Sequence, residues 1–130
     1  MFAQSATMEK ASKSSEEWAK AKGILVAGAD LSEQSNCARL VQEATEKLGG
    51  IDILVNCAGY LGRTQSFIGH RADDWERIVS VNLLGTMRVT QAVLPRMLEA
   101  GRGRIINFGS LAGKEGLASL SAYSAASGGV

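Results

Sequence analysis

The sequence has few of the residues that mark secreted, metal-binding or membrane-spanning proteins. Among its 130 residues are two cysteines, Cys37 and Cys57, which lack C-x-x-C spacing and fall on different predicted elements. We therefore expect two reduced thiols, with no disulfide framework and no zinc site. No apolar run approaches the roughly 20 residues of a spanning helix, and the opening residues hold no signal-peptide core. We expect a soluble, cytoplasmic protein with no membrane partner.

The chain also lacks an excess of charge of either sign. Fourteen Lys and Arg residues stand against 13 Asp and Glu, and the two signs are interspersed along the chain. A nucleic-acid or anionic-membrane partner would require a basic patch, so neither is expected. A small molecule is the expected partner, and the length suffices for one domain with its own core.

The N-terminal part differs in composition from the rest of the chain. Residues 1–22 are rich in Ser, Ala, Lys and Glu and poor in large apolar residues, which predicts a frayed helix or a disordered, weakly structured lead-in. Residues 23–130 form the predicted domain. Its buried strands are predicted where apolar runs show no polar alternation, at Ile24–Ala29, Ile51–Val55 and Ile105–Phe108.

Helical periodicity separates these strands. A helix is predicted to begin at Ser32, as its N-cap, and to end at Gly49-Gly50. A long helix starts near Asp73, is bent by Pro95 and ends before residue 103, and a further helix starts near Ala122. Strands alternating with helices predict an α/β fold with a Rossmann-like doubly wound parallel sheet, whose ligands bind at the carboxyl ends of the strands.

The loops that follow the predicted strands hold the candidate functional residues. They contain Asp30, the turn Asn56-Cys57-Ala58-Gly59, and the segment from Gly109 to Tyr123. A glycine at Gly59 lets the backbone approach a ligand closely, although an ordinary strand-to-helix turn would also explain the N-x-A-G pattern. Asn82 lies in the middle of the long helix among apolar residues, where a buried amide needs hydrogen-bond partners.

Together these motifs resemble the central part of the short-chain dehydrogenase/reductase family, and most of all its bacterial-type oxoacyl and sugar carbonyl reductases. Residues 56–59 are similar to the family's Asn-Asn-Ala-Gly turn. Residues 103–113 resemble the strand that leads to its catalytic serine, here Ser110, and Tyr123 follows 13 residues later as in the family's motif. The resemblance implies an oxidoreductase that transfers hydride between a nicotinamide and a small carbonyl or alcohol substrate.

The resemblance also implies roles for individual residues. Tyr123 would be the general acid or base, and Ser110 would hydrogen-bond the same substrate oxygen. Asn82 would hold a water in the proton relay; the alternative is a packing residue whose amide is satisfied.

NAD or NADP is the implied cofactor, and four residues match its binding positions: Asp30, Asn56, Ala58 and Gly59. Asp30 would contact the adenine end, although an acidic residue there could equally complement the N-terminus of the next helix.

Two departures from the family pattern change the expectation for this chain. Ser127 stands where the family has the lysine that lowers the tyrosine pKa and contacts the ribose, and the sequence has no glycine-rich pyrophosphate turn after a first strand. By resemblance the sheet is incomplete, without the first two strands and the C-terminal part. We therefore expect that the chain alone neither binds the cofactor nor catalyses. The alternatives are a non-catalytic module forming a homo-oligomer through the helices at 73–100 and 122–130, and a fragment without function.

Overall fold

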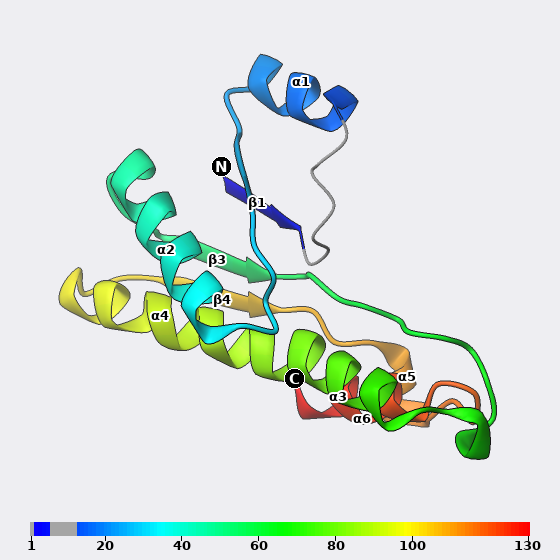
Figure 1. The fold of residues 1–130 in the computed structure, drawn as a ribbon. Helices are drawn as coiled ribbons and strands as arrows, with labels where there is room; N and C mark the ends of the chain where they lie inside the picture. Colours follow the sequence, from blue (N-terminus) through cyan, green and yellow to red (C-terminus); the bar gives the residue numbers. More distant parts are fainter. Residues whose placement is uncertain (1, 6–12) are drawn as a thin grey trace.

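Four short strands form two parallel pairs in the computed structural model, which describes residues 2–5 and 13–130 (Figure 1). Strand β1 (Phe2–Ser5) pairs with β2 (Leu25–Gly28), and β3 (Ile53–Asn56) pairs with β4 (Arg104–Asn107). The parallel pairing of β3 with β4 confirms the prediction that these strands are neighbours. Because they run in the same direction, the loops after both strands leave the same edge of the pair.

Helices connect and cover these strands. Their bounds are α1 (Lys13–Ala21), α2 (Gln34–Leu48), the 3-10 turn η1 (Phe67–Gly69), α3 (Ala72–Val79), the π-helical turn η2 (Ser80–Leu84), α4 (Gly85–Glu99), α5 (Leu111–Glu115) and α6 (Ser121–Gly129). The long helix expected from Asp73 is thus present, but a π turn interrupts its hydrogen bonding. Helix α5 lies where the sequence predicts only a loop.

The N-terminal part differs from the expected lead-in. Its described residues form strand β1 beside β2 and helix α1, whereas residues 1 and 6–12 lie outside the described part. The expectation of a frayed helix or a disordered lead-in is therefore wrong for residues 2–5, which form a strand. Periodicity could not reveal β1, because a strand of four residues with the sequence FAQS pairs through its backbone and carries little apolar signal. The boundary at residue 22 stays a prediction.

The ends of α2 show one correct and one wrong sequence prediction. Gly49 ends the helix as predicted, with φ of 75° and its N–H donating to the Thr45 carbonyl. The N-cap position is Glu33, not Ser32, and its side chain makes no capping hydrogen bond. The Ser32 hydroxyl instead donates to Asp30. The Ser32 side chain therefore bonds the nearby Asp30 carboxylate and does not cap the N–H groups of α2.

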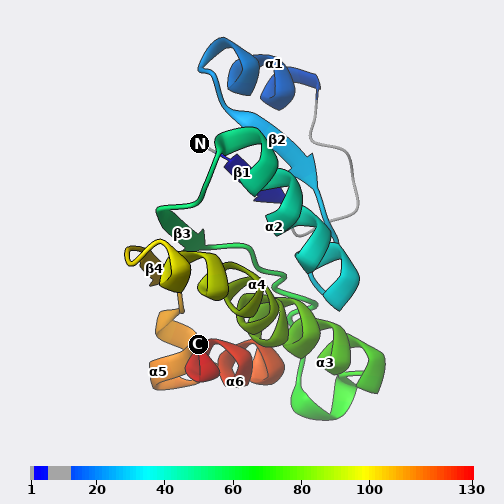
Figure 2. The same cartoon turned by 90° about the vertical axis from the view of Figure 1, so that its left-hand side faces the viewer.

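The main core lies between α2, α4 and one face of the β3–β4 pair. Leu54 of β3 and Ile105 of β4 turn toward aliphatic residues of both helices; the buried members are Ala29, Leu31, Cys37, Leu40, Val41, Leu54, Val89, Val93 and Met97. The opposite face of the pair is open, since Ile53 is 61% and Phe108 is 59% exposed. Figure 2 shows α3, α5 and α6 gathered at the end of the molecule away from α1. Within the described ranges, none of the helices is long and apolar enough to cross a membrane.

Candidate functional site

Asn56 fixes the carboxyl end of the β3–β4 pair. Its side chain is 4% exposed, and its amide nitrogen donates to Asn107 Oδ1 at 2.9 Å and to Thr90 Oγ1 at 3.1 Å. These bonds connect the ends of both strands to α4. Among the described residues Asn56 Oδ1 has no hydrogen-bond partner. The structure therefore gives Asn56 a role in shaping the loop, and its contact with a cofactor stays a prediction.

Asn82 holds the loop that follows β3 in place. Its Oδ1 accepts the Tyr60 N–H at 2.7 Å, and its amide nitrogen donates to the Tyr60 carbonyl at 2.9 Å. The side-chain amide of Asn82 thus bonds both the N–H and the C=O of Tyr60, in the way that a backbone amide pairs with a residue of a neighbouring strand. Asn82 is 7% exposed. The structure thus supplies the partners that a buried mid-helix amide requires.

The π turn gives Asn82 this position. Within it the Gly85 N–H donates to the Ser80 carbonyl, a bond that spans five residues instead of four. The extra residue rotates the helix face locally, and such turns are frequent at functional sites. Sequence periodicity predicts a continuous helix here. The polar Asn82 in an apolar stretch is the one sequence signal of the interruption.

The rest of the Asn56–Gly59 turn is divided between core and surface. Ala58 is half-buried and packs against the main core. Gly59 is exposed, and a Cβ at that position would lie 3.7 Å from Asn82 Oδ1, an ordinary contact. Within the described part of the chain, no group therefore requires a glycine at 59. The close approach of a ligand to this backbone stays a prediction.

Ser110 lies at the N-cap of α5, just past β4. Its Oγ accepts the Ala112 N–H at 3.2 Å, and its side chain is half-buried. A hydroxyl that accepts one bond still has its own hydrogen to donate. The short helix that Ser110 caps therefore holds the hydroxyl at the carboxyl end of β4, where a doubly wound sheet places its ligands.

Tyr123 belongs to α6, which packs against α3, the π turn η2 and α5. The half-buried Tyr123 side chain contacts a small core of Ile78, Ala122 and Ala126. Helix α6 lies so close to α5 that a Cβ at Gly113 would come within 2.5 Å of the α6 backbone. The structure thus brings together the elements that carry Ser110, Asn82 and Tyr123. Convergence of the two hydroxyl groups themselves stays a prediction.

Asp30 follows β2, in the loop that leads to α2. One of its carboxylate oxygens accepts the Ser32 hydroxyl at 2.7 Å and the Ser32 N–H at 3.0 Å. The Ser32 hydroxyl and, second, the Ser32 N–H hold the pKa of Asp30 below its usual value. The carboxylate is thus ionised near neutral pH, and the proposed adenine-end contact would have to use its other oxygen.

The residues present fit a substrate oxygen better than a whole dinucleotide. Ser110 and Tyr123 supply hydroxyl groups, which donate to or accept from a carbonyl or alcohol oxygen. The pyrophosphate is typically held by a glycine-rich turn at a helix start, and the sequence has no such turn. Ser127 also lacks the ammonium group with which the family's lysine contacts the ribose. Ser127 is half-buried and lies close to Gly109, since a Cβ added at Gly109 would be 3.3 Å from the Ser127 carbonyl oxygen. The dinucleotide therefore does not fit these residues in full.

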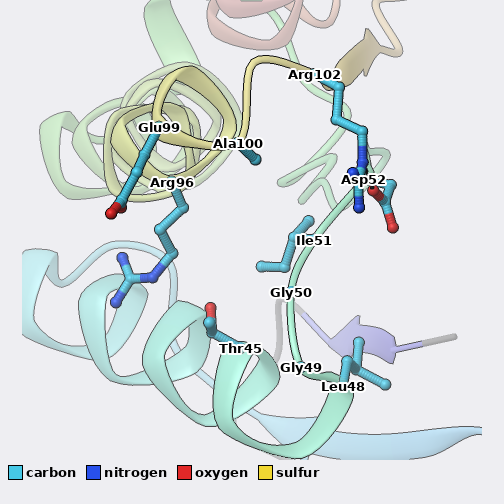
Figure 3. A pocket seen from close by; sticks show the side chains of 10 residues that line it. All are labelled: Thr45, Leu48, Gly49, Gly50, Ile51, Asp52, Arg96, Glu99, Ala100 and Arg102. Carbon is cyan, nitrogen blue, oxygen red and sulfur yellow. Dashed lines mark hydrogen bonds and ion pairs between the residues drawn. The ribbon is translucent and has the colours of Figure 1, made fainter.

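A pocket of about 530 Å³ lies at the opposite end of β3, where α2 and α4 end (Figure 3). Its lining includes Thr45, Ile51, Arg96 and an exposed ion pair between Arg102 and Asp52. None of the predicted site residues lines it. Among the described residues, no group of His, Cys, Asp and Glu side chains could hold a metal ion.

Comparison with known proteins identifies the class to which this fold and these residues belong. The family model for short chain dehydrogenases matches residues 2–130. The chain therefore belongs to the short-chain dehydrogenase/reductase family of oxidoreductases.

Individual relatives agree with this assignment. An acetoacetyl-CoA reductase of Allochromatium vinosum is 43% identical over 120 residues, which are 88% of this chain and 48% of the reductase. The solved structures of an actinorhodin polyketide ketoreductase with NADPH and of an NAD⁺-bound xylitol dehydrogenase match with TM-scores of 0.87 and 0.86, at 32% and 28% identity. Each match covers 98% of this chain and 50% of the other. These likenesses confirm the Rossmann-like fold, and the chain spans about half the length of the relatives it matches.

Proposed function

We propose that this chain carries the substrate-oxygen side of a nicotinamide-dependent reductase or dehydrogenase. The observation that carries the proposal is the convergence of three elements at one end of the β3–β4 pair. The loop held by Asn82, the helix capped by Ser110 and the helix bearing Tyr123 all contact the π turn or one another. The activity proposed is hydride transfer between a nicotinamide and a carbonyl or alcohol carbon, with a proton moving to or from the oxygen.

Tyr123 and Ser110 would act on that oxygen directly. The phenolic O–H of Tyr123 would donate a proton to it during reduction, or accept one during oxidation. Ser110 Oγ already accepts the Ala112 N–H, so its hydrogen is available to bond the same oxygen and stabilise developing charge. Asn82 would keep the Tyr60 loop in position beside them, and its role in holding a relay water is part of this proposal.

The cofactor would be NAD or NADP, bound with the help of groups that this chain does not supply. Asp30, Asn56, Ala58 and Gly59 would contact it, Asp30 at the adenine end. Serine at 127 supplies no fixed positive charge beside Tyr123 and no ammonium group for the nicotinamide ribose. We infer that the chain alone has neither measurable cofactor affinity nor activity. The substrate would be a small cytoplasmic carbonyl or alcohol compound, with oxoacyl and sugar-derived carbonyls as the first classes to test.

A chimera tests the proposed roles. The matching segment of the Allochromatium vinosum reductase is replaced by this chain carrying Ser127→Lys, so that the relative supplies the remaining half. We expect carbonyl reduction by this chimera, at least 100-fold less with Tyr123→Phe, and a smaller loss with Ser110→Ala, because general acid–base groups contribute about 10²–10⁴-fold. A chimera that stays fully active after both substitutions would contradict the assigned roles.

A second candidate function is a non-catalytic pairing module. Helix α4 and the turn before it expose an apolar stripe at helical spacing, formed by Leu84, Met87, Leu94 and Leu98, of which Leu98 is 71% and Met87 is 59% exposed. Two copies could bury these stripes against each other. Light scattering after gel filtration would show a dimer that Leu94→Glu with Leu98→Glu converts to a monomer; a monomeric parent chain would exclude this candidate.

A further inference from the structure

Arg88 connects two segments that are far apart in the sequence. It lies on the first turns of α4, half-buried, and its Nη1 atom lies 3.2 Å from the Ser80 carbonyl oxygen, 3.1 Å from Ser80 Oγ and 3.3 Å from the Leu31 carbonyl oxygen. One nitrogen thus serves both the π turn and the loop between β2 and α2. The sequence offers no signal for this, because an arginine on a helix is usually exposed.

The acceptors around Arg88 lie where the backbone has little access to water. Leu31 is 1% exposed, and its carbonyl also accepts the buried Cys37 thiol at 3.6 Å. Ser80 Oγ in turn donates to the Ser32 carbonyl at 3.3 Å. Buried carbonyls that lack donors are costly, so a guanidinium with several N–H groups stabilises this contact.

Gly85 allows the loop and the π turn to lie this close. A Cβ at Gly85 would come within 3.0 Å of Leu31 Cβ and 3.2 Å of the Leu31 carbonyl oxygen. The Gly85 N–H closes the π turn on the same Ser80 carbonyl that Arg88 bonds. The hydrogen bonds of Arg88 therefore act on the turn that sets the direction of Asn82.

We propose that Arg88 is a positioning residue that holds the π turn against the Leu31 loop and so keeps Asn82 aligned with the Tyr60 backbone. Its importance for catalysis rests on the proposed function, whereas its effect on Asn82 does not. The chain of contacts runs from the Leu31 loop through Arg88 and Ser80 to Asn82. Loss of the guanidinium frees the π turn to relax toward an ordinary helix, which rotates Asn82 away from Tyr60.

Hydrogen exchange of single backbone amides in the whole chain tests this proposal. In Arg88→Met the Tyr60 N–H, which Asn82 accepts, should exchange about tenfold faster or more, equivalent to roughly 1.4 kcal/mol. The Val93 N–H in α4 reports general opening of the chain and should change much less. Arg88→Lys keeps a cationic donor and should restore most of the protection. Arg96→Met is the matched control, because among the described residues the Arg96 guanidinium donates only to the Ala92 carbonyl of its own helix.

Three results would overturn the proposal. Unchanged Tyr60 exchange in Arg88→Met would show that Asn82 is held without Arg88. Equal acceleration at Tyr60 and Val93 would reduce Arg88 to a general stabiliser. If Arg88→Met does not fold, Arg88→Lys and Arg88→Gln are compared with the parent chain. Equal protection of the Tyr60 N–H in all three proteins would contradict the proposal. The measurement needs neither cofactor nor turnover, so the exchange rates still test the role of Arg88 if the proposed function proves wrong.

Discussion

Replacing Asn82 by alanine removes both hydrogen bonds that hold the Tyr60 backbone. The Tyr60 N–H loses an acceptor at 2.7 Å and the Tyr60 carbonyl loses a donor at 2.9 Å. Each buried polar group left without a partner costs about 1–3 kcal/mol. Tyr60 is half-buried, so water can satisfy part of what is lost. Two such groups would together cost about 2–6 kcal/mol without water. Because water replaces part of the loss, we expect the free energy of unfolding to fall by about 2–4 kcal/mol.

Asn82→Asp separates the two bonds. A carboxylate can still accept the Tyr60 N–H, but it cannot donate to the Tyr60 carbonyl and would place charge beside that oxygen. Because this desolvated charge is unpaired, Asp should destabilise at least as much as Ala. Urea unfolding followed by circular dichroism measures both variants, with the exposed Gln91→Ala on α4 as control. A loss below about 0.5 kcal/mol for Asn82→Ala, within the range of ordinary surface substitutions, would refute the reasoning.

Three further predictions concern packing, pH and thiol chemistry. Gly113→Ala should lower the melting temperature by several degrees in a thermal scan, because its Cβ would meet the α6 backbone at 2.5 Å. Gly28→Ala is the control and should leave the melting temperature unchanged, since a Cβ there would enter open space. Equal melting temperatures of the two variants would contradict the close α5–α6 packing. The lowered pKa of Asp30 contributes stability that is present above the unfolded value of about 3.9 and lost as the pH falls through the folded value. Unfolding free energies from pH 7 to pH 2 should therefore fall less steeply for Asp30→Asn, and parallel curves would show that Asp30 gains nothing on folding. The exposed Cys57 should react with a thiol reagent in the native chain. Cys37 should react only after unfolding, since burial shields its thiol and raises the pKa of that thiol. Fast labelling of both cysteines would contradict the burial of Cys37 in the core.

The sequence predicts well those features that depend on long apolar patterns. Leu40, Val41 and Ala44 repeat at helical spacing in α2 and are buried as expected. The apolar runs at β3 and β4 correctly predict strands, and the parallel pairing of these strands follows from the helices between them. The prediction that both strands are buried is wrong, because one face of the pair, with Ile53 and Ile106, is exposed. Site elements were predictable where a loop follows such a strand, which is where Asn56 and Ser110 lie.

The features that the sequence does not reveal depend on contacts between distant residues. Strand β1 pairs through its backbone, so its side chains carry no signal. The π turn depends on the bond from Gly85 to Ser80 and on Arg88, which no periodicity predicts. Ser32 has the residue type of an N-cap, yet Asp30 lies close enough to take its hydroxyl. Local propensity therefore places the elements, and tertiary hydrogen bonds decide their ends and interruptions.

Titration with NADH and NADPH, followed by nicotinamide fluorescence, tests the central claim that the chain holds substrate-oxygen residues without a complete cofactor site. Each missing charge-assisted hydrogen bond is worth roughly 1.5–3 kcal/mol, or one to two orders of magnitude in affinity. We predict no saturable binding by the chain, and none by Ser127→Lys, because a single lysine does not replace a pyrophosphate site. Saturable micromolar binding by the unmodified chain would contradict this account.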